Sequence, residues 1–291
     1  YNNRILLNME IKEYSFKTDS DIVQKAYKEY PNYLIESNNS VENDKICAIY
    51  FTSNDLYYPD NEETFKTRVI EKNSFEWYGN RIQKACKHIF VRDVCKQWYL
   101  IGINHIINSP KRLLDFLQKE TTGYQVITVG SSAGGYAATL YGSLLHAAKI
   151  MAFNPQFELH SLLSRSTECT NPLVHRMFKS HGGGYFNISN YISNPDIVFY
   201  FYSNKSRWDI EQAKVVESVA GLHRIAFHTS HHGIPFLKVA LPVVLNLDTE
   251  NLLKFEKKEQ HPLWFTIKMV GIIDTFVGFI RQAYRAYKKR H

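Results

Sequence analysis

The chain has 291 residues, 44% of them hydrophobic, and a formal net charge of +7 at pH 7. This length and composition allow a full hydrophobic core in one large α/β domain, and they exclude a repeat or low-complexity protein. The modest positive charge is as typical of a solvated surface as of an anionic partner, so by itself it indicates no particular ligand.

The four cysteines are scattered along the chain without C-x-x-C spacing, at Cys47, Cys86, Cys95 and Cys169. This pattern favours free thiols in a reducing compartment over disulfides, and we therefore expect a cytoplasmic protein. No signal-peptide pattern follows Tyr1, although we expect a chain that begins with Tyr rather than Met to lack its true start.

Short apolar runs alternate with helical or polar stretches along most of the chain. They predict strands at Ile46–Phe51, His88–Val91, Trp98–Ile103, Val126–Val129, Ile150–Phe153, Ile197–Tyr202 and Arg224–Phe227. A helix is predicted around residues 111–119, ahead of the fourth strand. Parallel strands need crossover connections, and the chain supplies them. The pattern therefore predicts an α/β fold with a doubly wound, mainly parallel sheet.

The most informative motif lies in the segment YQVITVGSSAGGYAATLYGSLL, residues 124–145, where Gly130, Ser132 and Gly134 fit G-x-S-x-G. A β-branched strand precedes this motif and a helix-forming stretch follows it. In such a nucleophile elbow, small flanking residues let the backbone turn so tightly that the serine hydroxyl stands above the sheet. A phosphate-binding turn is disfavoured, because no G-x-G-x-x-G and no P-loop lysine is present, and the remaining alternative is a structural glycine-rich turn. Ser132 is the predicted nucleophile.

The regular pattern is lost between about residues 156 and 195, where consecutive glycines and Asn-rich turns follow a short helical stretch. We expect a lid-like insertion here that covers Ser132, and the alternative is a long surface excursion without a role. The sequence His181-Gly182-Gly183-Gly184 is similar to the H-G-G-G of lipases. It follows the nucleophile instead of preceding it, so we interpret it as a lid hinge.

A serine hydroxyl is a poor nucleophile at neutral pH, so it needs a histidine to take its proton and a carboxylate to orient that histidine. Asp209 comes after the strand Ile197–Tyr202, where the order nucleophile, acid, base requires the acid. It is the predicted orienting acid, and its structural alternative is a helix N-cap. Glu211 is a second choice, because it should already lie within the following helix.

The loop after the strand Arg224–Phe227 carries several histidines at the carboxyl end of that strand. His232, directly before Gly233, is the predicted base, and His231 is the alternative base. A loose cluster is formed by His223, His228, His231 and His232. Because it lacks H-E-x-x-H and a nearby paired carboxylate, we predict no metal site.

An oxyanion hole needs two N–H donors directed at the developing negative charge. The N–H of Ala133, directly after the nucleophile, is the first predicted donor. The second is expected from the loop after the strand Ile46–Phe51, at Ser53 or Asn54.

With Ser132, Asp209 and His232 in this order, the chain resembles the α/β-hydrolase superfamily from about Ile46 to Leu247. Further motifs are similar to proteins of bacterial capsule and exopolysaccharide loci, including O-acetyltransferases with a hydrolase fold. These motifs are Arg92-Asp93, Trp98-Tyr99 and Gly102, the elbow GSSAGGYAA, and AFNPQ at Ala152–Gln156. The resemblance implies acyl transfer to a sugar hydroxyl through an acyl-serine intermediate, with acetyl-CoA as the usual donor.

The segment from His261 onward is strongly apolar and ends in the basic residues Arg281, Arg285, Lys288, Lys289 and Arg290. Because Lys268 and Asp274 interrupt the apolar run, it falls short of the roughly 20 residues that span a bilayer. We expect residues 261–291 to form an amphipathic helix on an anionic membrane surface, beside a catalytic domain of residues 1–260. The alternative is a helix packed on that domain or in a dimer. No nucleic-acid partner is predicted, because the charge is confined to one end.

These observations favour serine-dependent O-acetylation of a bacterial surface polysaccharide or its precursor, with no bound cofactor and acetyl-CoA as donor. We expect the enzyme to lie in the cytoplasm, peripherally at the inner membrane face. Trp208, Tyr185 and Phe186 are candidate stacking surfaces for the glycan. The alternatives are a carbohydrate or small-ester esterase, and a non-catalytic module that binds glycan or assembles a membrane complex.

Overall fold

The computed structural model describes residues 16, 18–38, 45–167, 171–181 and 184–290, and these residues form one seven-stranded sheet. The strands are β1 Tyr33–Ser37, β2 Ile46–Phe51, β3 Lys87–Val91, β4 Gln125–Ser131, β5 Lys149–Phe153, β6 Val198–Ser203 and β7 His223–Phe227. Their order is β1-β3-β2-β4-β5-β6-β7, and neighbouring strands are parallel except for β1 with β3. The predicted mainly parallel sheet is confirmed, and the antiparallel edge strand β1 has no counterpart among the predicted strands.

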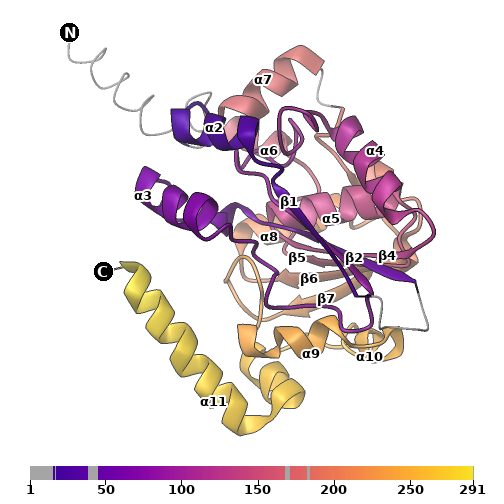
Figure 1. The fold of residues 1–291 in the computed structure, drawn as a ribbon. Helices are drawn as coiled ribbons and strands as arrows, with labels where there is room; N and C mark the ends of the chain where they lie inside the picture. Colours follow the sequence, from indigo (N-terminus) through magenta and orange to yellow (C-terminus); the bar gives the residue numbers. More distant parts are fainter. Residues whose placement is uncertain (1–15, 17, 39–44, 168–170, 182–183, 291) are drawn as a thin grey trace.

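Helices cover both faces of this sheet, with α4 and α5 on one side and α9 and α10 on the other (Figure 1). The α-helices are α2 Asp21–Glu29, α3 Glu62–Phe65, α4 Pro110–Thr121, α5 Ala133–Leu144, α6 His160–Arg165, α7 Pro172–His181, α8 Arg207–Val215, α9 Leu241–Leu245, α10 Thr249–Leu253 and α11 Pro262–Arg290. Short 3-10 helices are η2 Asn54–Leu56, η4 Ser189–Tyr191, η5 Pro195–Ile197 and η6 Lys238–Ala240, and η3 Lys66–Glu71 is a π-helix.

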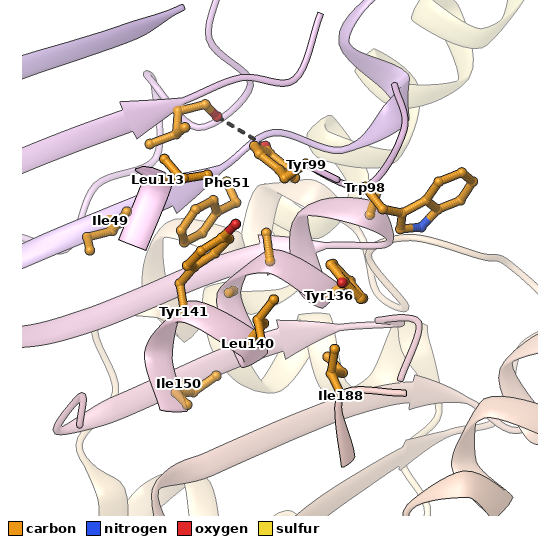
Figure 2. Close-up of a cluster of buried hydrophobic side chains, with 14 of the residues drawn as sticks. Ile49, Phe51, Trp98, Tyr99, Leu113, Tyr136, Leu140, Tyr141, Ile150 and Ile188 are labelled. Atoms are coloured by element: carbon orange, nitrogen blue, oxygen red, sulfur yellow. Dashed lines mark hydrogen bonds between the residues drawn. The ribbon is translucent and has the colours of Figure 1, made fainter. Parts of the chain in front are cut away.

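The central strand β2 shows how the sequence produces two cores. All six of its residues are buried, and successive side chains of a strand point to opposite faces. Ile49 and Phe51 belong to the core with α4 and α5, whereas Ala48 and Tyr50 belong to the core with α9. In Figure 2, Phe51 lies between Tyr99 and Tyr141, with ring centroids 5.6 Å from each. These aromatic contacts fix the carboxyl end of β2.

The predicted strand at Trp98–Ile103 is wrong, because this segment folds into turns. Trp98 and Tyr99 have positive φ values of 55° and 58°, which no strand residue adopts. The carboxylate of Asp93 accepts hydrogen bonds from the N–H groups of Cys95, Gln97 and Tyr99, at 3.0, 2.7 and 2.9 Å. A buried carboxylate that satisfies three N–H groups therefore determines the conformation of the segment after β3.

The excursion at residues 156–195 packs into the core through much of its described part. Phe157, Leu162, Val174 and Phe186 are buried in the cluster that includes α5, and the Tyr136 hydroxyl donates to the carbonyl of Tyr185 at 2.8 Å. Gly182 and Gly183 of the predicted hinge lie outside the described residues. The described part of the excursion therefore packs on the side of the sheet that α5 covers. That the excursion covers Ser132 stays a prediction.

Helix α11 consists of two halves that join at Gly271, where φ is 82° and ψ is 169°. In the first half, Phe265 is only 2% exposed and packs on Phe227, Phe236 and Phe255. The second half extends outward from α9 towards the C-terminus (Figure 1), with one side in contact with η6. By length and composition, Pro262–Tyr284 is a helix that could cross a membrane, and 22% of its 18-residue apolar stretch is buried.

Candidate active site

The turn between β4 and α5 has the geometry of a nucleophile elbow. Ser132 has φ 53° and ψ −121°, a strained conformation for a residue with a side chain. The turn requires glycine on both sides: a Cβ at Gly130 would lie 1.9 Å from the Gly134 carbonyl oxygen, and a Cβ at Gly134 would lie 2.2 Å from that of Phe51. The Ser132 hydroxyl is thereby placed at the carboxyl edge of the sheet.

Three predicted residues from distant parts of the chain meet at this elbow. His232 Nε2 lies 2.9 Å from Ser132 Oγ, and His232 Nδ1 lies 2.8 Å from Asp209 Oδ1. A carboxylate accepts hydrogen bonds only, so the Asp209 contact favours the imidazole tautomer with its proton on Nδ1. In that tautomer Nε2 is free to accept the proton of the serine hydroxyl.

Burial differs between His232, which contacts Ser132, and Asp209, which contacts His232. The Asp209 side chain is 0% exposed, whereas the His232 side chain is 30% exposed. The second carboxylate oxygen, Asp209 Oδ2, has no hydrogen-bond partner among the described residues. The charge of the buried carboxylate is therefore compensated mainly through His232, an arrangement that stabilises an imidazolium when one forms.

Asp209 lies within the first turn of α8 and not before the helix. Ser206 is the N-cap, and its Oγ accepts from the Asp209 N–H at 3.4 Å. The N-cap alternative for Asp209 is therefore wrong, because Ser206 occupies that position. The neighbouring residue Trp208 stacks on the imidazole of His232, with centroids 5.0 Å apart and planes inclined by 21°.

The loop that carries His232 is held by two polar residues that the sequence analysis did not identify. Asn154 Nδ2 donates to the Gly233 carbonyl at 2.8 Å and to Ser203 Oγ at 2.9 Å, and Ser203 Oγ donates to the His231 carbonyl at 2.6 Å. Asn154 is fully buried with φ 42°. The signal that could have found both residues is their position at the carboxyl ends of β5 and β6.

The two predicted loop donors for an oxyanion hole are in different situations. The Ser53 N–H donates to Glu76 Oε2 at 2.6 Å, so it already has an acceptor. The Asn54 N–H has none among the described residues. Ala133 is the first residue of α5, and its N–H therefore has no partner within that helix. Ala133 and Asn54 together remain the candidate donors.

The backbone of this loop is fixed by side chains from two other segments. The Tyr99 hydroxyl donates to the Thr52 carbonyl and the Trp77 Nε1–H donates to the Phe51 carbonyl, both at 2.8 Å. Desolvation raises the pKa of Glu76, while its hydrogen bond from Ser53 acts in the opposite direction. Glu76 is a carboxyl group beside the predicted oxyanion donors that sequence reasoning missed, because no motif marks it.

Among the described residues, Ser132 Oγ contacts His232 and neither His231 nor Glu211. The His231 side chain is exposed, and desolvation followed by the positive charge of Lys238 lowers its pKa. Glu211 pairs with Arg165 and Arg207 instead of a histidine. Among the residues that the structure describes, no group of three His, Cys, Asp or Glu side chains is arranged to hold a metal ion.

Of the three predicted stacking residues, only Trp208 contacts the triad. Phe186 is 1% exposed and packs on His160 and Phe178, so it is a core residue and presents no surface to a sugar. Tyr185 stacks on Tyr191, with centroids 5.6 Å apart.

A cavity of about 460 Å³ lies at the opposite edge of the sheet, at the amino ends of β2, β4 and β5. Lys149 lines it, and burial lowers the pKa of this lysine to about 8. Its ammonium group donates to the Leu247 carbonyl at 3.0 Å. This cavity is therefore separate from the triad.

The sheet order, the elbow after β4 and the chain order serine, aspartate, histidine define a fold of the α/β-hydrolase type. No protein-family model and no curated protein sequence matches the chain. Among solved structures, the capsule O-acetyltransferase of Neisseria meningitidis serogroup A matches over 67% of this chain and 82% of its own, at 11% identity and a TM-score of 0.47. A structure of that acetyltransferase contains CoA.

Two other similar structures are of differently named proteins. Esterase B from Lactobacillus rhamnosis matches over 75% of this chain and 81% of its own, at 11% identity and a TM-score of 0.36. MenH from S. aureus matches over 78% of this chain and 100% of its own, at 11% identity and a TM-score of 0.39. These are similarities of fold, and the function of this chain has to be argued from its own site.

Proposed function

We propose that the protein is a serine-dependent acyl-transfer enzyme with Ser132 as nucleophile, His232 as general base and acid, and Asp209 as orienting acid. The observation that carries the proposal is the continuous contact from Ser132 Oγ through the imidazole to the buried Asp209 carboxylate, at 2.9 and 2.8 Å. Such a relay is what an otherwise weak hydroxyl nucleophile requires.

In the first half of the reaction, His232 Nε2 takes the Ser132 proton while Oγ attacks the acyl carbonyl. The N–H groups of Ala133 and Asn54 would hold the resulting oxyanion. The tetrahedral intermediate then breaks its bond to the leaving group, which departs with the proton from Nε2, and acyl-Ser132 remains. In the second half, Nε2 deprotonates an acceptor hydroxyl, this oxygen attacks the acyl carbon, and the proton returns to Ser132 Oγ.

The preferred acceptor is a sugar hydroxyl of a bacterial surface polysaccharide or its precursor, and acetyl-CoA is the preferred donor. The motifs around Arg92, Trp98 and Ala152–Gln156 support this acceptor class by their resemblance to glycan O-acetyltransferases. Trp208 beside His232 provides an aromatic surface of the kind that stacks on sugar rings. A location at the inner membrane face belongs to the same proposal. Esterase activity, with water as acceptor, is the second candidate, because the same triad serves both reactions.

Labelling with a fluorophosphonate tests the nucleophile directly. We expect wild-type protein to gain one covalent adduct by intact mass, and Ser132→Ala to gain none. Ser131→Ala is the matched control, because this serine is the neighbouring residue and should leave labelling intact. If the wild type gains no adduct, the catalytic proposal fails and a non-catalytic glycan-binding module becomes the better explanation.

Labelled acetyl-CoA distinguishes transfer from hydrolysis. An acyl-serine partitions between water and a bound hydroxyl, whose effective molarity in well-oriented systems reaches about 10⁵ M. Label that appears on a capsular oligosaccharide supports transfer. Free acetate released at the same rate with and without oligosaccharide, with no label on the glycan, would favour the esterase.

A further inference from the structure

The second half of α11 presents a continuous apolar face to solvent. Eight large side chains after Gly271 are 38–79% exposed: Ile272, Ile273, Phe276, Val277, Phe279, Ile280, Tyr284 and Tyr287. Monomeric proteins rarely expose so many large apolar side chains together unless the surface binds something. The face therefore requires an occupant.

The opposite side of the same half forms a narrow contact with η6. Thr275 is 3% exposed, and Gln282 Oε1 accepts from the Lys238 N–H at 3.2 Å. A Cβ at Gly278 would lie 2.6 Å from Val239 Cβ, so the helix approaches η6 as closely as only glycine permits. By the 3.6-residue repeat, these contact residues lie on the side of the helix away from the apolar face.

The composition of this half fits an anionic lipid surface. After Gly271 the chain has one acidic residue, Asp274, and five basic residues, at positions 281, 285, 288, 289 and 290. An apolar helical face with basic residues beside it lies in the interface of an anionic bilayer. The exposed part from Ile272 to Tyr287 is about 24 Å long, shorter than the roughly 30 Å hydrocarbon core. It cannot be lengthened through Gly271, because Phe265 and its neighbours belong to the protein core.

The η6 contact connects this helix to the active site. Lys238 begins η6 six residues after His232, and its positive charge acts on both His231 and Glu76. A helix that lies on a membrane with its η6 side uppermost places η6, into which the loop of His232 leads, on the side away from the lipid. This arrangement suits a polar acceptor that projects from the membrane rather than one within the hydrocarbon.

We propose that the second half of α11 binds an anionic membrane surface and holds the triad above it, so that the acyl acceptor is a hydroxyl on the headgroup of a membrane amphiphile. The inference rests on the proposed acyl-transfer function for its chemistry, and it specifies the substrate class: a headgroup-borne hydroxyl rather than a free oligosaccharide.

Vesicle sedimentation tests the surface. We expect full-length protein to bind phosphatidylcholine vesicles that contain phosphatidylglycerol, to bind pure phosphatidylcholine weakly, and to lose binding as salt rises. Phe276→Ser should weaken binding about 10-fold, because it removes a large apolar group from the lipid contact. Ile106→Ser is the matched control, since Ile106 and Phe276 are each 64% exposed, and it should bind as wild type does.

Equal binding of Phe276→Ser and wild type would overturn the membrane contact. So would a wild-type dimer that dissociates in Phe276→Ser while neither protein binds vesicles, because the face would then belong to a second copy of the chain. Sedimentation equilibrium measures this. Both variants alter exposed side chains, and unchanged circular dichroism checks that they fold.

An anchored reporter tests the connection to the triad. The reporter is a nitrophenyl acetate linked to phosphatidylethanolamine by a spacer of about 10 Å, the helix diameter, and it is compared with free nitrophenyl acetate. We expect wild type to turn over the anchored ester at least about 10-fold faster than Gly278→Val does, because the added side chain pushes the helix away from η6 and the triad is then no longer held in position over the surface. The variant should still bind vesicles and hydrolyse the free ester normally.

The outcomes separate the two proposals. If wild type hydrolyses neither ester, the acyl-transfer function itself fails. If it hydrolyses the free ester but vesicles give no advantage for the anchored one, the function stands and the membrane-borne substrate is wrong. If Gly278→Val handles the anchored ester as wild type does, the η6 contact has no part in presenting the triad, and the proposed link is wrong.

Discussion

The carboxyl edge of the sheet and the second half of α11 use apolar residues in opposite ways. At the sheet edge, Phe51 and the elbow are enclosed by aromatic rings and by hydrogen bonds from Tyr99, Trp77 and Asn154. In α11, side chains of the same type are exposed, as Phe276 is at 64%. Enclosure fixes atoms to within the tolerance that proton transfer needs, whereas exposure leaves binding energy available for a partner.

The largest effect on activity should come from substitutions at the enclosed carboxyl edge of the sheet. Ser132→Ala and His232→Ala should each lower kcat for a soluble ester by about 10⁴-fold or more. The double variant should be little worse than either single one, because the two residues act as a unit. Multiplicative losses in the double variant would show that Ser132 and His232 do not share one step.

Replacement of the buried acid should be nearly as severe. Asp209→Asn should lower kcat by about 10³-fold or more, because an amide that donates to His232 Nδ1 favours the wrong imidazole tautomer. Circular dichroism and the melting temperature should stay close to wild type, since the shape of the side chain is kept. Near-normal activity would mean that another residue orients His232, or that the enzyme works with a dyad.

Two phenylalanines of α11, one buried and one exposed, allow the same comparison within a single helix. Phe265→Ala should lower the free energy of unfolding by about 3–5 kcal/mol, because this ring fills the core against Phe236. Phe276→Ala should change it by less than about 0.5 kcal/mol. Urea denaturation measures both. Equal losses would place the second half of the helix in the folding core.

The free energy of unfolding should depend on pH through the buried carboxyl of Asp93. Burial raises the pKa of Asp93 from its ordinary 3.8 to about 6. Between these values the folded protein binds more protons than the unfolded chain, so this carboxyl's contribution to stability is full below the lower value and is lost as pH rises through about 6. The stability of wild type relative to Asp93→Asn should therefore fall by about 2 kcal/mol between pH 4 and pH 7. An unchanged difference would contradict the assignment.

The smallest effect on kcat is expected from Asn154, which positions the loop of His232. Asn154→Gly keeps the positive φ but removes the hydrogen bonds to Gly233 and Ser203, and it should lower kcat by about 10-fold with KM for a soluble ester nearly unchanged. Asn246→Ala is the control, because Asn246 bonds the backbone near Arg81, away from the triad. A rise in KM alone would assign Asn154 to substrate binding instead.

The sequence by itself determined the six parallel strands of the sheet and the local form of the elbow. Both depend on short-range properties: β-branched runs form buried strands, and only glycine allows the close approach around Ser132. The order of Ser132, Asp209 and His232 could also be predicted, because loops at the carboxyl ends of parallel strands meet at one edge. Their contacts join residues 100 and 23 positions apart, Ser132 with His232 and His232 with Asp209.

Only the tertiary structure decided the features that depend on partners far away in the sequence. The run Trp98–Ile103 has strand-like composition, but the buried Asp93 carboxylate takes three of the N–H groups around it and holds it in turns. Phe186 has the composition of a sugar platform and is buried in the core. Glu76 belongs to no motif, and the AFNPQ motif gives no role to its Asn154. The roles of both residues follow from the backbone groups they contact. Such contacts are set by packing of the whole chain, which local sequence patterns do not encode.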